Sequence, residues 1–451
     1  MKCLKDKGFI LQRHIRYAII SGTILRITEK ICRNMKQKLG NYIKILAFTV
    51  FLGAFSGLVI WCFLKAVAFG SALIWTKAGE FTGIPYITVL LCVLGGLAAG
   101  LLRRRYGDYP EELSVVLYKV KHEKHYDYHP MFVILLCAFI PLITGASVGP
   151  EAGLTGIIAA LCYWIGDNVN YAGENAMLFS ELGEAVTLGQ LFHSPLFGII
   201  AVEEEGDDQG NEGGRKIPRS TRLVLYVLST TAGLLVMEAL NRQFGAAMSG
   251  FPAFSEASFS SKDLLLLLLY ILVGMLLFLL YELFEKLTAK VAGKVPAVVR
   301  EGFCGLIIGL AGLFFPMVIF SGEEQMAELM ESFTSYTPLI LLGICVLKLL
   351  MTAFCLNFGL KGGHFFPIIF ACTCMGFCLT QFLFSGTPEH AAFAAAAITA
   401  TVIGAQLQKP LAASLLLLLC FPFKILPWIF LCAVLGMAGG KALSGLMKGE
   451  R

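Results

Sequence analysis

The chain has 451 residues, of which 57% are hydrophobic and 15% are charged, and its formal net charge is +5. Soluble domains carry about 25% charged residues, so this composition excludes an ordinary soluble domain. Apolar runs of about 20 residues, the length that crosses a bilayer, recur along the chain and predict an all-α polytopic membrane protein surrounded by lipid. The small net charge gives no indication of a nucleic-acid partner.

The first segment, 1–44, is basic: it holds eleven Lys or Arg residues against two acids, and it alternates apolar and basic positions. This pattern is typical of a helix lying on a membrane surface, and basic flanks prefer the cytoplasm. We therefore expect a cytoplasmic N-terminus in a multi-pass protein of the plasma membrane. No small-residue cleavage site follows the short apolar stretch, so no secretory signal is expected.

Two membrane repeats follow, at 45–245 and 262–446, before a short tail at 447–451. The first repeat includes a polar Gly-rich loop at 205–219. The fourteen cysteines are scattered singly, mostly inside apolar runs, and no Cys/His cluster predicts a metal or a cofactor.

The stretch GASVGPEAGLTG (145–156) interrupts an apolar run with glycines, a proline and an acid. Its opening, GASVGP, shares the pattern of a glycine, four residues and a proline with GGHFFP at 362–367. Further on, GQLFHSPL (189–196) and GAQLQKPL (404–411) share a glycine, five residues and Pro-Leu. The helix-breaking residues of the first pair are Gly145, Pro150, Gly362, Gly363 and Pro367.

Paired interruptions at matching places in two halves indicate an internally repeated transporter, with its site at the interface between the repeats. Gly and Pro stop a helix inside the membrane, and the next helix begins there with exposed N–H groups and a positive dipole end. Two such helix starts, one after Pro150 and one after Pro367, predict a binding site for an anion.

Together, the segments GPEAGLTG, FHSPLFGIIAVEE, LKLLMTAFCLNFGLKGGHFFP and GAQLQKPLAASLLLLL resemble the CLC family of chloride channels and transporters, from about residue 45 to 446. The resemblance implies inverted repeats of tilted, partly spanning helices, and a homodimer with a separate anion pathway in each subunit. It also implies no enzymatic activity. The implied anion-binding groups are the backbone amides of Ser147, Val148, Gly149, His364, Phe365 and Phe366.

The chain departs from the family pattern in its first half. The family signature G-K/R-E-G-P carries a glutamate that gates the anion site and takes up protons, and that position is Val148 here. A valine can do neither, which favours passive transport of chloride or a similar anion. The inner serine position falls on Gly107, and no tyrosine follows Tyr336 to supply the family's pore tyrosine. The inner proton-path glutamate falls on Glu205.

Other acids leave alternatives open. Glu151 is either an acid of a first helical turn that faces protein, or a substitute gate that titrates; Glu184 is the second candidate. A proton-coupled exchanger of chloride or fluoride that uses such an acid is therefore the alternative function. An intramembrane enzyme is a distant one, because the chain has no HExxH motif and its GxSxG match, GASVG (145–149), falls within the first helix-breaking motif. The dimer is expected to form through spans near 195–202, 220–240, 410–420 and 424–446.

Overall fold

The computed structural model divides the chain into two compact units, residues 1–51 and residues 52–451. The described residues are 42–76, 86–111, 115–116, 119, 126–168, 176–192, 194, 196–200, 219–246, 252–254, 257, 259–296, 299–385 and 387–448. Nearly all of the basic segment 1–44, most of the loop 205–219, and Glu205 therefore lie outside the described residues.

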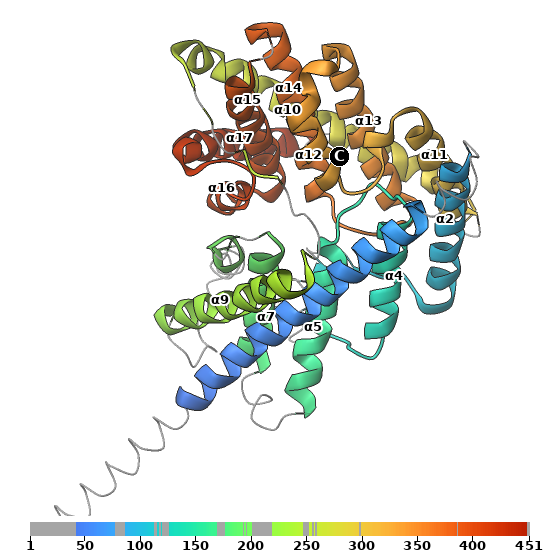
Figure 1. The fold of residues 1–451 in the computed structure, drawn as a ribbon, viewed down its shortest axis with the longest axis vertical. Helices are drawn as coiled ribbons and strands as arrows, with labels where there is room; N and C mark the ends of the chain where they lie inside the picture. Colours follow the sequence, from blue (N-terminus) through green and yellow to red (C-terminus); the bar gives the residue numbers. More distant parts are fainter. Residues whose placement is uncertain are drawn as a thin grey trace, which may run out of the picture. The chain divides into compact units, whose positions relative to one another are not determined.

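Helices make up almost all regular structure in these ranges (Figure 1). After the helix Tyr42–Thr76 they are, in chain order, α2 (Ile87–Tyr106), α4 (Met131–Ile143), α5 (Glu151–Asn168), α7 (Ala176–Leu191), α9 (Arg219–Phe244), α10 (Ser261–Ala292), α11 (Arg300–Phe314), α12 (Glu323–Ser332), α13 (Pro338–Asn357), α14 (Phe365–Phe384), α15 (Pro388–Leu407), α16 (Pro410–Leu417) and α17 (Leu426–Lys448). Short 3-10 turns lie at Pro316–Val318, Phe333–Ser335 and Phe423–Ile425.

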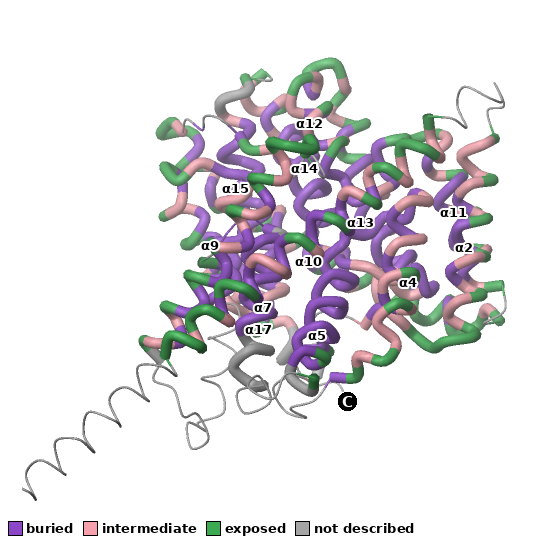
Figure 2. Tube along the Cα trace, turned by 60° about the horizontal axis from the view of Figure 1, so that its bottom comes forward, coloured by how far each residue is buried: buried purple, intermediate pink, exposed green. Residues whose placement is uncertain are grey.

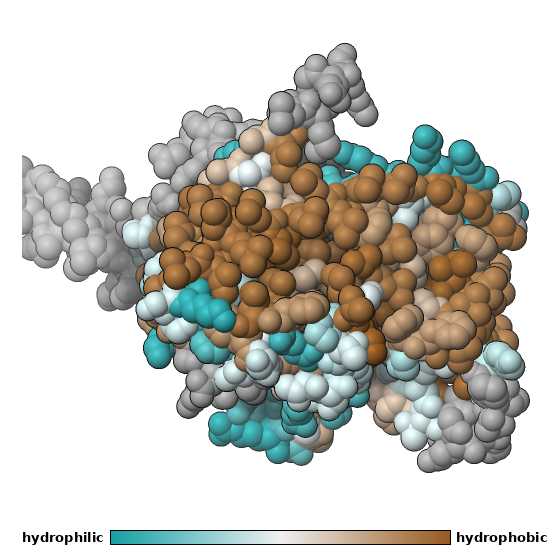
Figure 3. Space-filling model, turned by 90° about the horizontal axis from the view of Figure 1, so that it is seen from above, coloured by the Kyte–Doolittle hydropathy of each residue, from teal (hydrophilic) through white to brown (hydrophobic). Residues whose placement is uncertain are grey.

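Eight of the described helices are long and apolar enough to cross a membrane: Tyr42–Thr76, Ile87–Tyr106, Ser220–Phe244, Ser261–Ala292, Pro338–Asn357, Phe365–Phe384, His390–Leu407 and Phe423–Leu443. The all-α polytopic fold predicted from the composition is thus confirmed. Figure 3 shows one face covered mostly by hydrophobic side chains, as a surface in contact with lipid requires. The 13 residues of α4 are too few to cross, because at 1.5 Å per residue they span about 20 Å.

Several helices begin at or directly after a proline. The first residue of α13 is Pro338, and the hydroxyl of the preceding Thr337 accepts the N–H of Ile340 (3.4 Å). Pro410 likewise begins α16, and α5 begins directly after Pro150. Proline suits the first turn because its ring fixes a helical φ and the missing N–H would have no partner inside the helix.

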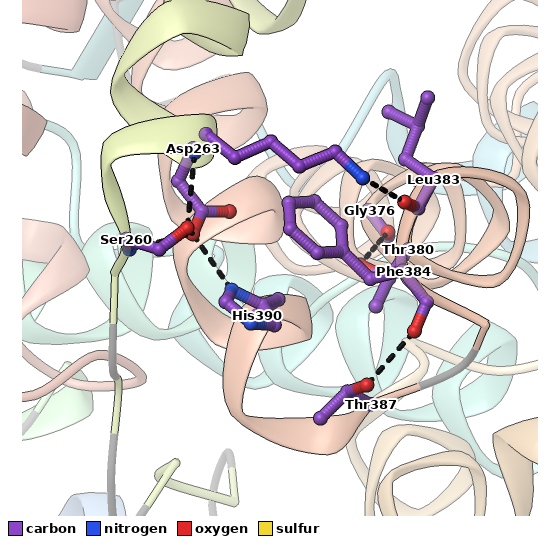
Figure 4. Close-up of polar contacts among 9 residues, drawn as sticks. Ser260, Asp263, Gly376, Thr380, Leu383, Phe384, Thr387 and His390 are labelled. Atoms are coloured by element: carbon purple, nitrogen blue, oxygen red, sulfur yellow. Dashed lines mark hydrogen bonds and ion pairs between the residues drawn. The ribbon is translucent and has the colours of Figure 1, made fainter.

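A capping box begins α10 and ties it to α15 (Figure 4). The N–H of Ser260 donates to Asp263 Oδ2 (2.8 Å), and His390 Nδ1 lies 2.7 Å from the same oxygen. The imidazole also stacks on the Phe384 ring, with 4.1 Å between ring centroids. One carboxylate therefore joins the starts of two helices beside the end of α14.

Close backbone contacts let α2 and α11 pack against each other. A Cβ on Gly96 would lie 2.2 Å from the carbonyl oxygen of Glu301, and one on Gly305 would lie 2.1 Å from that of Cys92. Membrane helices approach closely where residues are small, since hydrocarbon chains leave packing as the main source of attraction. Figure 2 shows that α5 and α14 are buried over most of their length, so the helices bearing the predicted anion site form the interior.

Candidate functional site

The two glycine–proline motifs meet inside the protein. The N–H of Gly149 donates to the carbonyl of Gly363 (2.8 Å), and the N–H of Gly363 donates to the carbonyl of Gly149 (2.8 Å). These two hydrogen bonds form an antiparallel bridge between segments more than 200 residues apart. The repeat seen in the sequence thus corresponds to a contact between the starts of α5 and α14.

The first member of the second motif pair also contacts the second half of the chain. The Ser194 hydroxyl, in GQLFHSPL, donates to the carbonyl of Leu415 (2.9 Å), which lies in α16 four residues past the end of GAQLQKPL. A hydrogen bond thus joins the two halves near the second pair of motifs as well as at the first.

Glu151 is the first residue of α5, and its side chain crosses to α14. Its Oε1 accepts the backbone N–H of Phe366 (3.2 Å), in the first turn of α14. Only 1% of Glu151 is exposed, and its Oε2 is buried with no hydrogen-bond partner among the described residues. A carboxylate thus occupies the helix start at which the sequence predicts an anion.

Two glycines make room for this carboxylate. A Cβ on Gly149 would lie 2.0 Å from Glu151 Oε2, and a Cβ on Gly363 would lie 1.9 Å from the same atom. Any side chain at either position would overlap with the carboxylate, so the bridge positions are restricted to glycine while Glu151 stays where it is.

The backbone amides of the first motif donate within the protein. The N–H of Ser147 points to Cys355 Sγ (3.3 Å), that of Val148 to the carbonyl of Ala146 (2.9 Å), and that of Gly149 across the bridge. In this conformation these three N–H groups therefore already have acceptors within the protein. The start of α14 is the place where a backbone N–H meets a negatively charged side chain.

Val148, which holds the family's glutamate position, is fully buried and packs against the second motif. A Cβ on Gly362 would lie 2.5 Å from Val148 Cγ2. The valine thus serves as packing between the two motifs.

Aromatic rings surround the start of α14. The Phe192 ring stacks on Phe366 (5.2 Å between centroids) and meets Phe365 edge to face (6.4 Å). The His364 ring lies 4.5 Å from the Phe365 ring and 6.3 Å from that of Tyr281. The N-terminal turn of α14 therefore lies against a cluster of aromatic rings, which lowers the polarity around it and strengthens electrostatic interactions there.

Lys348 holds the turn before α12. It is fully buried in α13, and its Nζ donates to the carbonyls of Val318 (3.0 Å), Ile319 (3.3 Å) and Phe320 (2.6 Å). Three carbonyl acceptors satisfy the three donors of an ammonium group. Lys348 thus fixes the backbone that leads to the first residue of α12.

That residue, Glu323, is a second buried acid that the sequence did not single out. It is 4% exposed, and its charge interacts with that of Glu151. Its segment, FSGEEQ, is typical of a polar surface loop. The only feature of the sequence that pointed to a buried acid there is the pair of acids close after an apolar run.

A chain of ion pairs joins the loops that approach the two motifs. Arg103 Nη1 lies 3.0 Å from Glu301 Oε1, and Arg103 Nε lies 2.9 Å from Asp108 Oδ1. Lys361 Nζ lies 3.6 Å from Asp108 Oδ2. The pairs connect the loop at Gly107, where the sequence places the serine position, with the loop that leads to Gly362 and Gly363.

The contacts of the other two candidate acids are not known. Glu205 lies outside the described residues, and Glu184 is part of α7 but its side chain is not described. Within the described part of the chain, no group of three or more His, Cys, Asp or Glu could hold a metal ion.

A family model described as "Voltage gated chloride channel" matches residues 95–440, well over half of the chain. The chain belongs to this family. The resemblance to CLC proteins drawn from the sequence motifs is thereby confirmed. CLC proteins are membrane transporters and channels for anions.

The chain is also similar to the chloride channel protein CLC-e of Arabidopsis thaliana, with 24% identity over 266 residues. That match covers 56% of this chain and only 36% of the relative.

Three solved structures share the fold. A slow cyanobacterial Cl⁻/H⁺ antiporter matches with a TM-score of 0.72 and 18% identity, covering 89% of this chain and 95% of its own. A CLC-type fluoride/proton antiporter matches with a TM-score of 0.66 and 19% identity, covering 88% and 95%. A eukaryotic CLC transporter matches with a TM-score of 0.68 and 16% identity, covering 89% and 72%. The CLC-type architecture expected from the sequence is confirmed.

Proposed function

We propose that this protein exchanges chloride, or a similar small anion, for protons, and that Glu151 is the acid that gates the pathway. The observation that carries the proposal is the hydrogen bond from the N–H of Phe366 to Glu151 Oε1 (3.2 Å). The start of a helix favours negative charge, so the carboxylate takes the place that a permeating anion would occupy.

Protonation would open such a gate. A neutral carboxyl group loses its electrostatic attraction to the start of α14, leaves the Phe366 amide, and admits an anion. The same side chain carries the proton, which couples the two movements. The sequence favoured passive transport because Val148 holds the family's glutamate position; the direction in which Glu151 points supports the coupled alternative instead.

The proposed anion-binding groups are the amides at the start of α14, those of His364, Phe365 and Phe366. The amides of Ser147, Val148 and Gly149 remain proposed ligands only for a conformation in which their present acceptors are released. Two structural neighbours are a Cl⁻/H⁺ antiporter and a fluoride/proton antiporter, which supports an exchange of a halide for protons by this chain.

The test is anion flux and proton uptake, measured together in liposomes that contain the purified protein. The parent is expected to drive protons uphill when a chloride gradient is imposed, and to run faster as the pH falls. Glu151→Gln is expected to keep anion flux, lose proton uptake, and lose the acceleration by acid. Glu328→Gln, which removes an exposed acid, is the matched control and is expected to behave like the parent.

Two outcomes would contradict the proposal. Chloride flux without any proton movement in the parent would establish the passive alternative. Uphill proton uptake that survives in Glu151→Gln would show that another acid carries the protons. Repeating the flux assay with fluoride, bromide and nitrate identifies the preferred anion.

We further propose a homodimer in the plasma membrane, with a cytoplasmic N-terminus. The spans expected at the dimer contact expose apolar side chains, including Leu235 (66%) in α9 and Phe430 (42%) in α17. Labelling of a single cysteine placed in the basic segment 1–44, from one side of sealed vesicles at a time, tests the orientation.

A further inference from the structure

Glu323 is a buried acid that has no role in the exchange proposed above. It is the first residue of α12, directly after Gly322, whose φ of +104° lets the chain turn sharply into the helix. The acid is 4% exposed, although α12 lies outside the candidate membrane spans. A buried carboxyl group outside those spans calls for a functional explanation, because burial of an unpaired charge is costly.

A partly open pocket lies beside both Glu323 and the start of α5. Its lining includes Pro150, the residue directly before Glu151, as well as Glu323 itself. Ser71, Ser321 and Gln325 add polar groups to the wall. Water in this pocket would therefore reach one acid directly and lie beside the helix start that carries the other.

The charges around Glu323 are negative. Glu151 on α5 and Glu324 on α12 interact with its carboxylate, and the Cys420 thiol also faces it. Burial away from water, followed by these two carboxylates, raises the pKa of Glu323 to about 8. No basic side chain pairs with Glu323 among the described residues, and the nearby Lys348 ammonium donates to carbonyls of residues 318–320 instead.

Two carboxylates that interact in a water-poor environment resist being ionised together, so they titrate as a pair. Glu151 also has the buried, unpartnered Oε2 that a shared proton would satisfy. One acid of the pair, Glu323, therefore lies at the pocket, and the other, Glu151, lies at the predicted anion site.

We propose that Glu323 is the proton partner of Glu151: it takes a proton from pocket water and passes it, through that water, to the Glu151 carboxylate. Glu323 becomes ionised as Glu151 becomes neutral, so the transfer needs no other reactant. The inference rests on the gating function proposed for Glu151.

The test compares Glu323→Gln with Glu328→Gln in liposomes, since both remove one acid from α12, and Glu328 is exposed and does not line the pocket. Glu323→Gln is expected to keep anion flux at acid pH within several-fold of the parent, and to slow proton uptake per anion at least tenfold. Glu328→Gln should match the parent.

Glu323→Asp keeps a carboxyl group on a shorter side chain, and is expected to take up protons at an intermediate rate. Parent rates of proton uptake in Glu323→Gln, or in Glu323→Asp if only that variant folds, would overturn the inference. An equal loss in Glu328→Gln would also overturn it, because the effect would then belong to the net charge of α12. The gating proposal fails separately, if Glu151→Gln retains coupled proton uptake.

Discussion

Gly363→Ala tests whether the Glu151 carboxylate controls the pathway from its place beside the Phe366 amide. The added Cβ would lie 1.9 Å from Glu151 Oε2, 2.0 Å from Cδ and 2.5 Å from Oε1. Non-bonded heavy atoms settle at about 3.5 Å, so the carboxylate has to move by about 1.5 Å. The obstacle is the end of a flexible side chain, and the backbone bridge to Gly149 can therefore persist.

That movement takes Oε1 out of hydrogen-bond range of the Phe366 N–H, from which it now lies 3.2 Å. A hydrogen bond to a charged group contributes about 1.5–3 kcal/mol. The ionised, lodged form of the gate loses this stabilisation, whereas the protonated form does not. Each pH unit corresponds to about 1.4 kcal/mol, so the midpoint of acid activation should move to higher pH by roughly one to two units.

The assay is chloride efflux from liposomes between pH 4 and 9, for the parent, Gly363→Ala and Gly343→Ala. Gly343 is the control because no atom lies within 4 Å of a Cβ built on it. Size-exclusion chromatography confirms that each variant is folded. An unchanged midpoint in folded Gly363→Ala would refute the reasoning, and so would loss of flux at every pH, because the methyl group itself would then block the pathway.

The remaining predictions concern stability and assembly. Arg103→Ala leaves Glu301, which is 2% exposed, without its 3.0 Å partner, and should destabilise the protein by roughly 2–3 kcal/mol. The partial exposure of Arg103 keeps the figure below that of a fully buried pair. Thermal unfolding in detergent should show a lower Tm than for the exposed Arg104→Ala control, and equal values would contradict the ion-pair argument. Light scattering in mild detergent should give the mass of two chains, and a mass of one chain at all concentrations would contradict the dimer.

The helix starts and the meeting of the two motifs could be predicted from the sequence, because Gly and Pro act locally. Pro150 and Pro367 determine where helical hydrogen bonding can begin, whatever surrounds them. The repeat of the motifs then indicated that these starts belong to one interface. The contact between Gly149 and Gly363 shows that the two helix starts do meet.

The roles of the acids could not be predicted in the same way. Counting from the family signature puts Glu151 three residues past the usual gate position, so the sequence left open whether it faces protein or substitutes for the gate. Its actual direction depends on the bridge, which brings the first turn of α14 within reach of α5. Glu323 depends even more on tertiary structure, since its burial follows from packing around a short polar helix whose sequence resembles a surface loop.

The bridge between Gly149 and Gly363 also limits the mechanics of transport. Repeat-built transporters often alternate access by rocking one half against the other. Here, such rocking would either pivot on two backbone hydrogen bonds of 2.8 Å or break both in a place where little water can replace them. Rotation of one glutamate side chain requires neither. The turnover rate of this protein should therefore follow the barrier of a side-chain rotation and a proton transfer, with the helices serving as a stationary frame.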